Sequence, residues 1–155
     1  MRLATVADFP EMHRVRMSVL ENRLRNAASV QLSDYEAILD RGGRGWVAEL
    51  EGRIIGFAVA DLARSNVWAL FVDPVTEGRG IGRQLHDTMM DWMFSSGIHY
   101  VWLSTEPGTR AERFYRAAHW WYAGEEPSGE VRFEMTREQW ARQAAALDAR
   151  LRRSL

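Results

Sequence analysis

The spacing of apolar residues divides the first third of the chain into a short strand and two helices. Residues 2–7 have a strand-like pattern, and Asp8 follows as a helix N-cap. Apolar residues at helical spacing then predict a helix that runs to about Asn22–Arg25. Ser33 begins a capping box before a second apolar stripe, so we expect a second helix that ends at Gly42-Gly43.

The next segment changes from helical spacing to apolar, β-branched runs. Two such runs, Gly45–Leu50 and Arg53–Leu62, are joined by Glu51-Gly52. A two-residue connection with glycine second is typical of a β-hairpin. A third run of strand-forming residues, Asn66–Asp73, ends at a proline. We expect these three runs to form an antiparallel meander.

Helical and strand patterns alternate in the second half of the chain. Apolar residues return to helical spacing at Gly80, and the pattern stops at Gly97. The predicted order of elements is β-αα-βββ-α-β-α-ββ-α, which indicates one α+β domain over residues 1–155 without repeats or linkers. The later elements are a strand at His99–Ser104, a short helix at Ala111–Ala118, strands at Trp120–Ala123 and Glu130–Met135, and a helix capped by Thr136.

Composition excludes several functional classes. A formal net charge of −1 argues against nucleic acid as the main partner. Because no cysteine is present, disulfides, cysteine nucleophiles and cysteine-bound zinc are excluded. His13, His86, His99 and His119 lack the spacing of metal ligands, so we expect no metal. No signal peptide or run of roughly 20 apolar residues is evident, so we expect a cytoplasmic protein without membrane contact.

A glycine-rich loop between a strand and a helix, within residues 70–85, is the most informative stretch. The first turn of a helix leaves about four backbone N–H groups unpartnered, and the helix dipole adds roughly half a positive charge. Glycines let an anion approach this backbone closely, which favours a phosphate site. A plain strand-to-helix turn is the alternative, while a Walker A loop and a dinucleotide fingerprint both fit less well. The candidate anion-binding residues are Gly78, Arg79, Gly80, Ile81, Gly82 and Arg83.

Two motifs resemble those of the GNAT superfamily of acetyl-CoA-dependent N-acetyltransferases. Val72-Asp73-Pro74 precedes the loop Glu77–Gly82, which is similar to the family's pyrophosphate-binding loop, and Ala111–Tyr115 matches the family's Ala-x-x-Phe-Tyr helix. The resemblance implies a mostly antiparallel central sheet, splayed in the middle and layered between helices as α/β/α. It also implies acetyl-CoA as cosubstrate and direct attack by a primary amine of a small molecule or protein.

The resemblance also assigns the residues that would hold acetyl-CoA. Backbone groups of Leu70, Phe71 and Val72 would pair with the pantetheine arm, and the loop amides would hold the pyrophosphate. Thr109 and Phe114 would complete the cofactor-binding residues. These assignments are expectations that come from the family and not from composition or spacing.

Two departures from the family pattern affect how the donor would be held. Glu77 stands where Gln or Arg is usual, so its side chain would not help to neutralise phosphate. Gly108 stands where Asn is frequent, so that contact would be missing or made by Thr109. Binding would then depend on backbone amides, Arg79 and Arg83.

Acetyl transfer needs a group that stabilises the departing thiolate and a group that accepts the amine proton. The resemblance implies that Tyr115 is the general acid; the alternative is a packed aromatic residue beside Phe114. Asp61, Glu106 and His119 are candidate general bases by position. Each also has a structural explanation, as a strand end, a turn residue and a packed or surface residue.

The acceptor is not identified by any motif. By resemblance, the loop Asn22–Leu32 would lie over the acceptor cleft, where Arg23, Arg25 and Asn26 either bind an acidic group or are ordinary solvated residues. We expect an N-acetyltransferase. The alternatives are an acyl-CoA-binding module without turnover and a structural protein. The sequence leaves open whether the enzyme or the module would form a homodimer.

Overall fold

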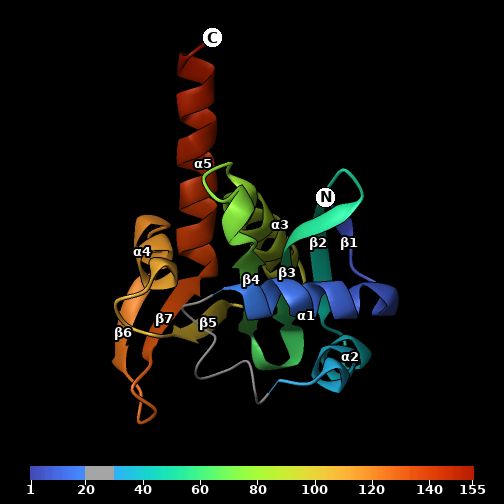
Figure 1. Cartoon of the computed structure of the whole chain (residues 1–155). Coiled ribbons are helices and arrows are strands. Elements are labelled where there is room, and N and C mark those ends of the chain that lie inside the picture. Colours follow the sequence, from blue (N-terminus) through green and yellow to red (C-terminus); the bar gives the residue numbers. More distant parts are fainter. Residues whose placement is uncertain (20–29) are drawn as a thin grey trace.

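The computed structural model describes residues 1–19 and 30–155, and it confirms the predicted order of elements (Figure 1). The fold is α+β. The elements are β1 (Arg2–Leu3), α1 (Phe9–Ser18), α2 (Leu32–Asp40), β2 (Arg44–Leu50), β3 (Arg53–Asp61), β4 (Asn66–Val72), α3 (Ile81–Ser95), β5 (Tyr100–Thr105), α4 (Arg110–Ala117), β6 (Trp121–Glu125), β7 (Val131–Thr136) and α5 (Arg137–Arg153).

The strands form one seven-stranded sheet in the order β1-β2-β3-β4-β5-β7-β6. Neighbouring strands are antiparallel except β4 and β5, which run parallel. The register joins β4 to β5 at Asn66 and Trp102, next to a 2.9 Å hydrogen bond from Trp102 N to Ser65 O. Beyond this point the two strands diverge, so the sheet is splayed in the middle.

Helices cover both faces of the sheet, which gives three layers (Figure 1). On one face, α1 and α2 pack on β2–β4 through an apolar cluster that includes Met12, Tyr35 and Phe57. On the other face, α3 and α4 pack through a larger cluster that includes Met89 and Tyr115. The C-terminal part of α5 extends beyond the other elements (Figure 1).

The predicted hairpin between β2 and β3 is confirmed. Glu51 and Gly52 have φ values of 52° and 77°, so both lie in the left-handed region that two-residue hairpin turns require. Antiparallel pairing continues from β3 to β4, with Phe57 opposite Phe71. The hairpin therefore fixes the strand that precedes the glycine-rich loop.

The N-terminal strand is shorter than the predicted residues 2–7, because the chain turns after Leu3. The Asp8 carboxylate accepts hydrogen bonds from Thr5 N at 2.8 Å and from both terminal guanidinium nitrogens of Arg2 at 2.8 Å. These contacts bend the segment into a 3-10 turn before α1. Asp8 nevertheless precedes α1 as its N-cap residue, as predicted.

Two helix boundaries also differ from the predictions. The helix α1 ends at Ser18 because Val19 has an extended backbone, so the predicted end at Asn22–Arg25 is wrong. The N-cap residue of α2 is Gln31, two residues before the predicted cap Ser33, and the helix begins at Leu32. Its first turn is closed by a 2.7 Å hydrogen bond from Gln31 N to the Asp34 carboxylate.

Residues 1–19 and 30–155 contain neither a helix that could span a membrane nor a cluster of potential metal ligands. None of the helices there has both the length and the apolar character that crossing a membrane requires. In the same part of the chain, no group of three or more potential metal ligands is found.

Candidate active site

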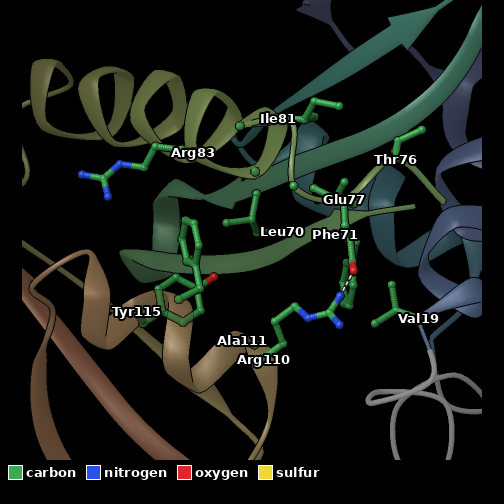
Figure 2. Close-up of a pocket in the computed structure, with 15 residues that line it drawn as sticks. Val19, Leu70, Phe71, Thr76, Glu77, Ile81, Arg83, Arg110, Ala111 and Tyr115 are labelled. Atoms are coloured by element: carbon green, nitrogen blue, oxygen red, sulfur yellow. Dashed lines mark ion pairs between the residues drawn. The ribbon is translucent and has the colours of Figure 1, made fainter. Parts of the chain in front are cut away.

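A cavity of about 290 Å³ lies between the end of β4, the glycine-rich loop and the first turns of α4 (Figure 2). Its size is close to the lower end of the range for small-molecule sites, roughly 300 Å³. We call it the donor cavity. Its lining residues are Val19, Leu70, Phe71, Val72, Thr76, Glu77, Gly78, Gly80, Ile81, Gly82, Arg83, Arg110, Ala111, Phe114 and Tyr115.

The backbone of the glycine-rich loop forms one wall of the donor cavity. Gly78 and Gly80 have φ values of 81° and 76°, a region that other residues enter only with strain. Gly80 is the N-cap residue of α3, so the first turn of this 15-residue helix points its backbone N–H groups at the cavity end. A Cβ at either glycine would meet no atom within 4 Å, which leaves room for a bound group.

Hydrogen bonds behind the loop hold it in place. Asp73 donates its backbone N–H to Ile55 O at 2.7 Å, and its carboxylate accepts from Val75 N at 3.1 Å. The Thr76 hydroxyl donates to Asp73 O at 3.0 Å. Arg14 of α1 also forms a 3.4 Å ion pair with the Asp73 carboxylate. The loop is therefore anchored to β3 and α1 before it reaches the glycines.

Two of the three arginines near the loop, Arg83 and Arg110, are engaged with carboxylates. Arg83 donates to Asp87, four residues along α3, at 3.1 Å, and extends away from the Glu77–Arg110 pair (Figure 2). Arg110, at the start of α4, forms an ion pair with Glu77 across the donor cavity (Figure 2). Arg79 is exposed and lies outside the lining residues. Glu77 thus places a negative charge against Arg110 at the cavity, where it would repel a bound anion.

A second, smaller cavity of about 70 Å³ lies where β4 and β5 diverge. We call it the acceptor slot. It shares Leu70, Phe71, Ala111 and Tyr115 with the donor cavity, so the two spaces meet at these residues. The other lining residues are Arg16, Val67, Trp68, Ala69, Leu103, Ser104, Thr105 and Glu130.

Tyr115 lies at the junction of the two cavities. Its side chain is only 6% exposed and packs edge-on against Phe114 and Trp120, with ring centroids 5.3 and 5.4 Å away. Its hydroxyl points toward β4 at Leu70 (Figure 2). Burial raises the pKa of the phenol above its ordinary value, so the group stays protonated through neutral pH. Tyr115 is thus both a packed aromatic residue and a donor facing the cavities.

The three carboxylate and histidine candidates for the general base lie outside both cavities. Asp61 is fully buried at the end of β3 and accepts hydrogen bonds from Arg41 at 2.6 and 3.2 Å. His119 is exposed, with φ 65°, and lines a separate hollow beside α5. Glu106 follows β5, where its backbone oxygen accepts from Thr109. Glu130, which the sequence analysis missed, is the carboxylate among the lining residues of the slot.

Of the two residues at α4 expected to contact the cofactor, Phe114 lines the donor cavity and Thr109 does not. The Thr109 hydroxyl accepts from Glu112 N at 3.3 Å and donates to Glu106 O at 2.7 Å, so it caps α4. Arg23, Arg25 and Asn26 lie outside the described residues.

His86 is a further buried residue, which the sequence analysis considered only as a possible metal ligand and not as part of this site. Trp120 Nε1 can only donate, so its 3.0 Å contact with His86 Nε2 requires that nitrogen to be unprotonated. His86 Nδ1 then carries the proton and donates to the Asp87 carboxylate at 2.8 Å. Burial lowers the pKa of His86, which agrees with a neutral ring. The ring packs on Phe114 and Tyr115, so it positions α4 against α3.

A splayed sheet, a glycine-rich loop at a helix N-terminus and a buried tyrosine where two cavities meet are together the arrangement expected of an acyltransferase that uses an acyl-CoA donor. The sequence profile of the Acetyltransferase (GNAT) family matches residues 9–120, which is most of the chain. The chain therefore belongs to the GNAT acetyltransferase family, the acetyl-CoA-dependent N-acetyltransferases.

Solved structures share the fold at low sequence identity. A structure of yncA from Salmonella typhimurium with its cofactor acetyl-CoA is 22% identical and covers 87% of this chain and 91% of its own, with a TM-score of 0.72. Ribosomal-protein-alanine N-acetyltransferase from Brucella melitensis is 23% identical, covers 87% and 98%, and has a TM-score of 0.68.

An aminoglycoside acetyltransferase, AAC(6')-Ib, was solved in complex with coenzyme A and kanamycin. It is 18% identical, covers 91% of this chain and 96% of its own, and has a TM-score of 0.70. No curated protein sequence matches the chain. At these identities the similarity establishes the fold and leaves the acceptor open.

Proposed function

We propose that this acetyltransferase moves the acetyl group of acetyl-CoA directly to a primary amine held in the acceptor slot. The observation that carries this proposal is that the donor cavity and the slot share Tyr115, Leu70, Phe71 and Ala111. A thioester entering along β4 and an amine in the slot would meet beside the Tyr115 hydroxyl. Relatives solved with acetyl-CoA or coenzyme A support the choice of donor.

The donor would be held mainly by backbone groups. The pantetheine arm would pair with Leu70, Phe71 and Val72, since β5 does not occupy this part of β4. The pyrophosphate would bind the amides from Gly78 to Arg83 at the N-terminus of α3. Because Arg83 and Arg110 are already in ion pairs with Asp87 and Glu77, side-chain charge contributes less than in an unpaired loop.

The chemistry balances without an acyl-enzyme. The neutral amine attacks the thioester carbon, a C–N bond forms and the C–S bond breaks, and the sulfur leaves with the electron pair. The Tyr115 phenol donates to that sulfur. Its raised pKa makes complete proton transfer unfavourable to a thiolate whose conjugate acid has a pKa of about 8.5, so a hydrogen bond that strengthens as charge develops is the favoured role.

We assign Glu130 as the group that accepts the amine proton. It precedes β7 and lines the slot on the side of Ser104 and Thr105. Asp61 is occupied by Arg41 at the end of the sheet where β4 and β5 still pair, so it is poorly placed for this role. The Glu130 carboxylate accepts a 3.5 Å hydrogen bond from Ser128 Oγ, and its negative charge at the slot favours binding of the amine as its ammonium form before deprotonation.

An acyl-CoA-binding module without turnover is the competing function, and two measurements separate it from an enzyme. Calorimetry with acetyl-CoA should show binding to a single site in either case. Release of free CoA thiol in the presence of a panel of amines should occur only for an enzyme. Tight acetyl-CoA binding with no thiol release from any amine would contradict our proposal.

Three broader expectations from the sequence remain part of this proposal. Residues 1–155 act as one domain, the protein works in the cytoplasm, and the formation of a homodimer stays open. The net charge of −1 supports a small amine or protein acceptor in preference to nucleic acid. Size-exclusion chromatography with light scattering would test the homodimer directly.

A further inference from the structure

A buried arginine reaches the acceptor slot from α1. Arg16 is only 5% exposed, and its Nη1 donates to the Tyr35 hydroxyl at 3.2 Å. Its Nε is buried without an acceptor. Among the residues that the structure describes, no carboxylate lies within ion-pair distance of Arg16. Within the described part of the chain, the guanidinium is therefore a buried cation without a carboxylate partner and with one nitrogen, Nε, left without an acceptor.

Aromatic rings form the remaining surroundings of this guanidinium. Its carbon lies 4.6 Å from the ring centre of Trp68 and 4.9 Å from that of Phe71. Such cation–π contacts contribute roughly 0.5–2 kcal/mol each. Removal of a charge from water generally costs several kcal/mol, and buried arginines usually recover this cost by pairing with an anion. The rings alone leave this cost incompletely offset, which indicates a site prepared for an anionic group.

Arg16 is one of the residues that line the slot, so an anion bound in the slot can reach its guanidinium. The slot has a volume of about 70 Å³ and is also lined by Glu130, so a singly charged carboxylate is favoured over a doubly charged phosphate, which Glu130 would repel more strongly. Arginine binds carboxylates through two parallel hydrogen bonds in its planar fork. Glu130, the proposed base, lines the same slot and would attract the amine.

We propose that the acetyl acceptor carries a carboxylate close to its amine, as a free amino acid does, and that Arg16 binds this carboxylate while Glu130 receives the amine. A small zwitterion complements a slot lined by one cation and one anion. This inference rests on the proposed function, since it names the acceptor class of the same site. It assigns to Arg16 a role in specificity and positioning, separate from the bond-making step.

The test uses the twenty free amino acids with the intact chain. For each amino acid that is acetylated, its amide and its decarboxylated amine are matched acceptors. We expect kcat/KM for the acid to exceed that for the amide by about 100-fold, the loss that follows removal of one partner of a buried charge pair. Equal or better use of the amide or amine would overturn the role of Arg16 while leaving the acetyltransferase proposal intact.

Variants of Arg16 separate a binding role from a structural one. Arg16→Gln should abolish the preference for the acid and raise its KM, with acetyl-CoA affinity unchanged. Arg16→Lys should restore part of the preference, because the charge remains but the planar fork is lost. Arg142→Gln, at an exposed position on α5, is the matched control. Retention of the acid preference in folded Arg16→Gln, as judged by circular dichroism, would overturn the proposal.

Calorimetry keeps the inference testable if no acceptor is acetylated. The CoA-saturated protein is titrated with each amino acid, and any that binds is compared with its amide. Binding of the acid that Arg16→Gln abolishes would support the carboxylate site even though the proposed catalysis had failed. If no amino acid binds, the proposed carboxylate site at Arg16 is overturned. If both Arg16 variants fail to fold, the comparison of each acid with its amide in the wild-type protein still tests the proposal.

Discussion

The donor cavity and the acceptor slot are built in different ways although they share a wall. The donor cavity is made mostly of two continuous segments, the stretch from β4 to the start of α3, which contains the glycine-rich loop, and the first turns of α4. The slot collects polar side chains from α1, β5 and the approach to β7, namely Arg16, Ser104, Thr105 and Glu130.

This difference indicates which part of the reaction each region controls. Backbone amides bind any group with the charge and shape of pyrophosphate, so the donor cavity is suited to one invariant ligand. Side chains of opposite charge would select an acceptor by its own charges, so under our proposal the slot would determine specificity. Substitutions of side chains should therefore have larger effects in the slot and at its junction than in the donor cavity.

Tyr115 lies at the junction, and its substitution should have the largest effect. Tyr115→Phe is expected to lower kcat by about 100-fold, because the departing sulfur loses its donor, while acetyl-CoA affinity stays unchanged. Since burial raises the pKa of this phenol, kcat of the wild-type enzyme should show no alkaline decline from Tyr115 below about pH 10. Steady-state and stopped-flow kinetics over a range of pH measure the loss of kcat in the variant and the pH dependence of the wild-type enzyme, with Tyr122→Phe as a control.

Unchanged kcat with a good acceptor would reduce Tyr115 to a packing residue. In that case the buried ring, in contact with His86, Phe114 and Trp120, would explain its presence fully.

Glu130 should give the next largest effect. Glu130→Gln is expected to lower kcat/KM for the amine by roughly 30-fold at pH 7, since the variant cannot accept the amine proton. The deficit should shrink as pH rises toward the pKa of the acceptor amine, because more of the amine is then already neutral. Thiol-release assays at several pH values, with Glu138→Gln on α5 as control, measure this. A deficit that is constant with pH would argue for a binding role instead.

The donor side of the site was predictable because its information is local in the sequence. A strand, three glycines and a helix start lie within residues 70–85, and the Ala111–Tyr115 motif follows on one helix turn. Element order and the hairpin at Glu51-Gly52 also depend on local patterns, and both were correct. Helix ends were less predictable, since the end of α1 at Ser18 has no glycine or proline to mark it.

The acceptor slot was not predictable, because its residues meet only through the tertiary fold. Arg16 lies on an apolar face of α1 and resembles any helical arginine until Trp68 and Phe71 are placed beside it. Asp61 and Glu130 both flank strands in the sequence. Asp61 pairs with Arg41, whereas Glu130 lines the slot, a difference set by which end of β4 separates from β5.

A substitution in the donor loop should have a moderate effect that is confined to the donor. Gly80→Ala forces alanine into the left-handed region at φ 76°, which costs about 1–2 kcal/mol. We expect the Kd for acetyl-CoA to rise about tenfold and kcat at saturation to be unchanged. Gly52→Ala is a matched control, because its φ of 77° and open surroundings are the same but it lies in the hairpin. Equal acetyl-CoA binding by both variants would contradict a backbone anion site.

The smallest expected effect tests how far side-chain charge contributes to the donor cavity. Glu77→Gln removes a carboxylate that pairs with Arg110, so less negative charge would lie beside a bound phosphate. Both groups are partly exposed, and exposed pairs contribute about 0–1 kcal/mol, so calorimetry should show acetyl-CoA binding about threefold tighter at low salt. The gain should fade at 1 M salt, where the Debye length is about 3 Å.

The control for this change is Asp148→Asn, which removes a carboxylate from an exposed ion pair with Arg152 near the end of α5. It alters net charge by the same amount far from both cavities, so it should leave acetyl-CoA binding unchanged. Weaker binding in Glu77→Gln would mean that the Glu77–Arg110 pair organises the loop and that the amides depend on it. Tighter binding that persists in 1 M salt would point to a contact other than charge, and the contrast between a backbone-built donor cavity and a charge-selective slot would then need revision.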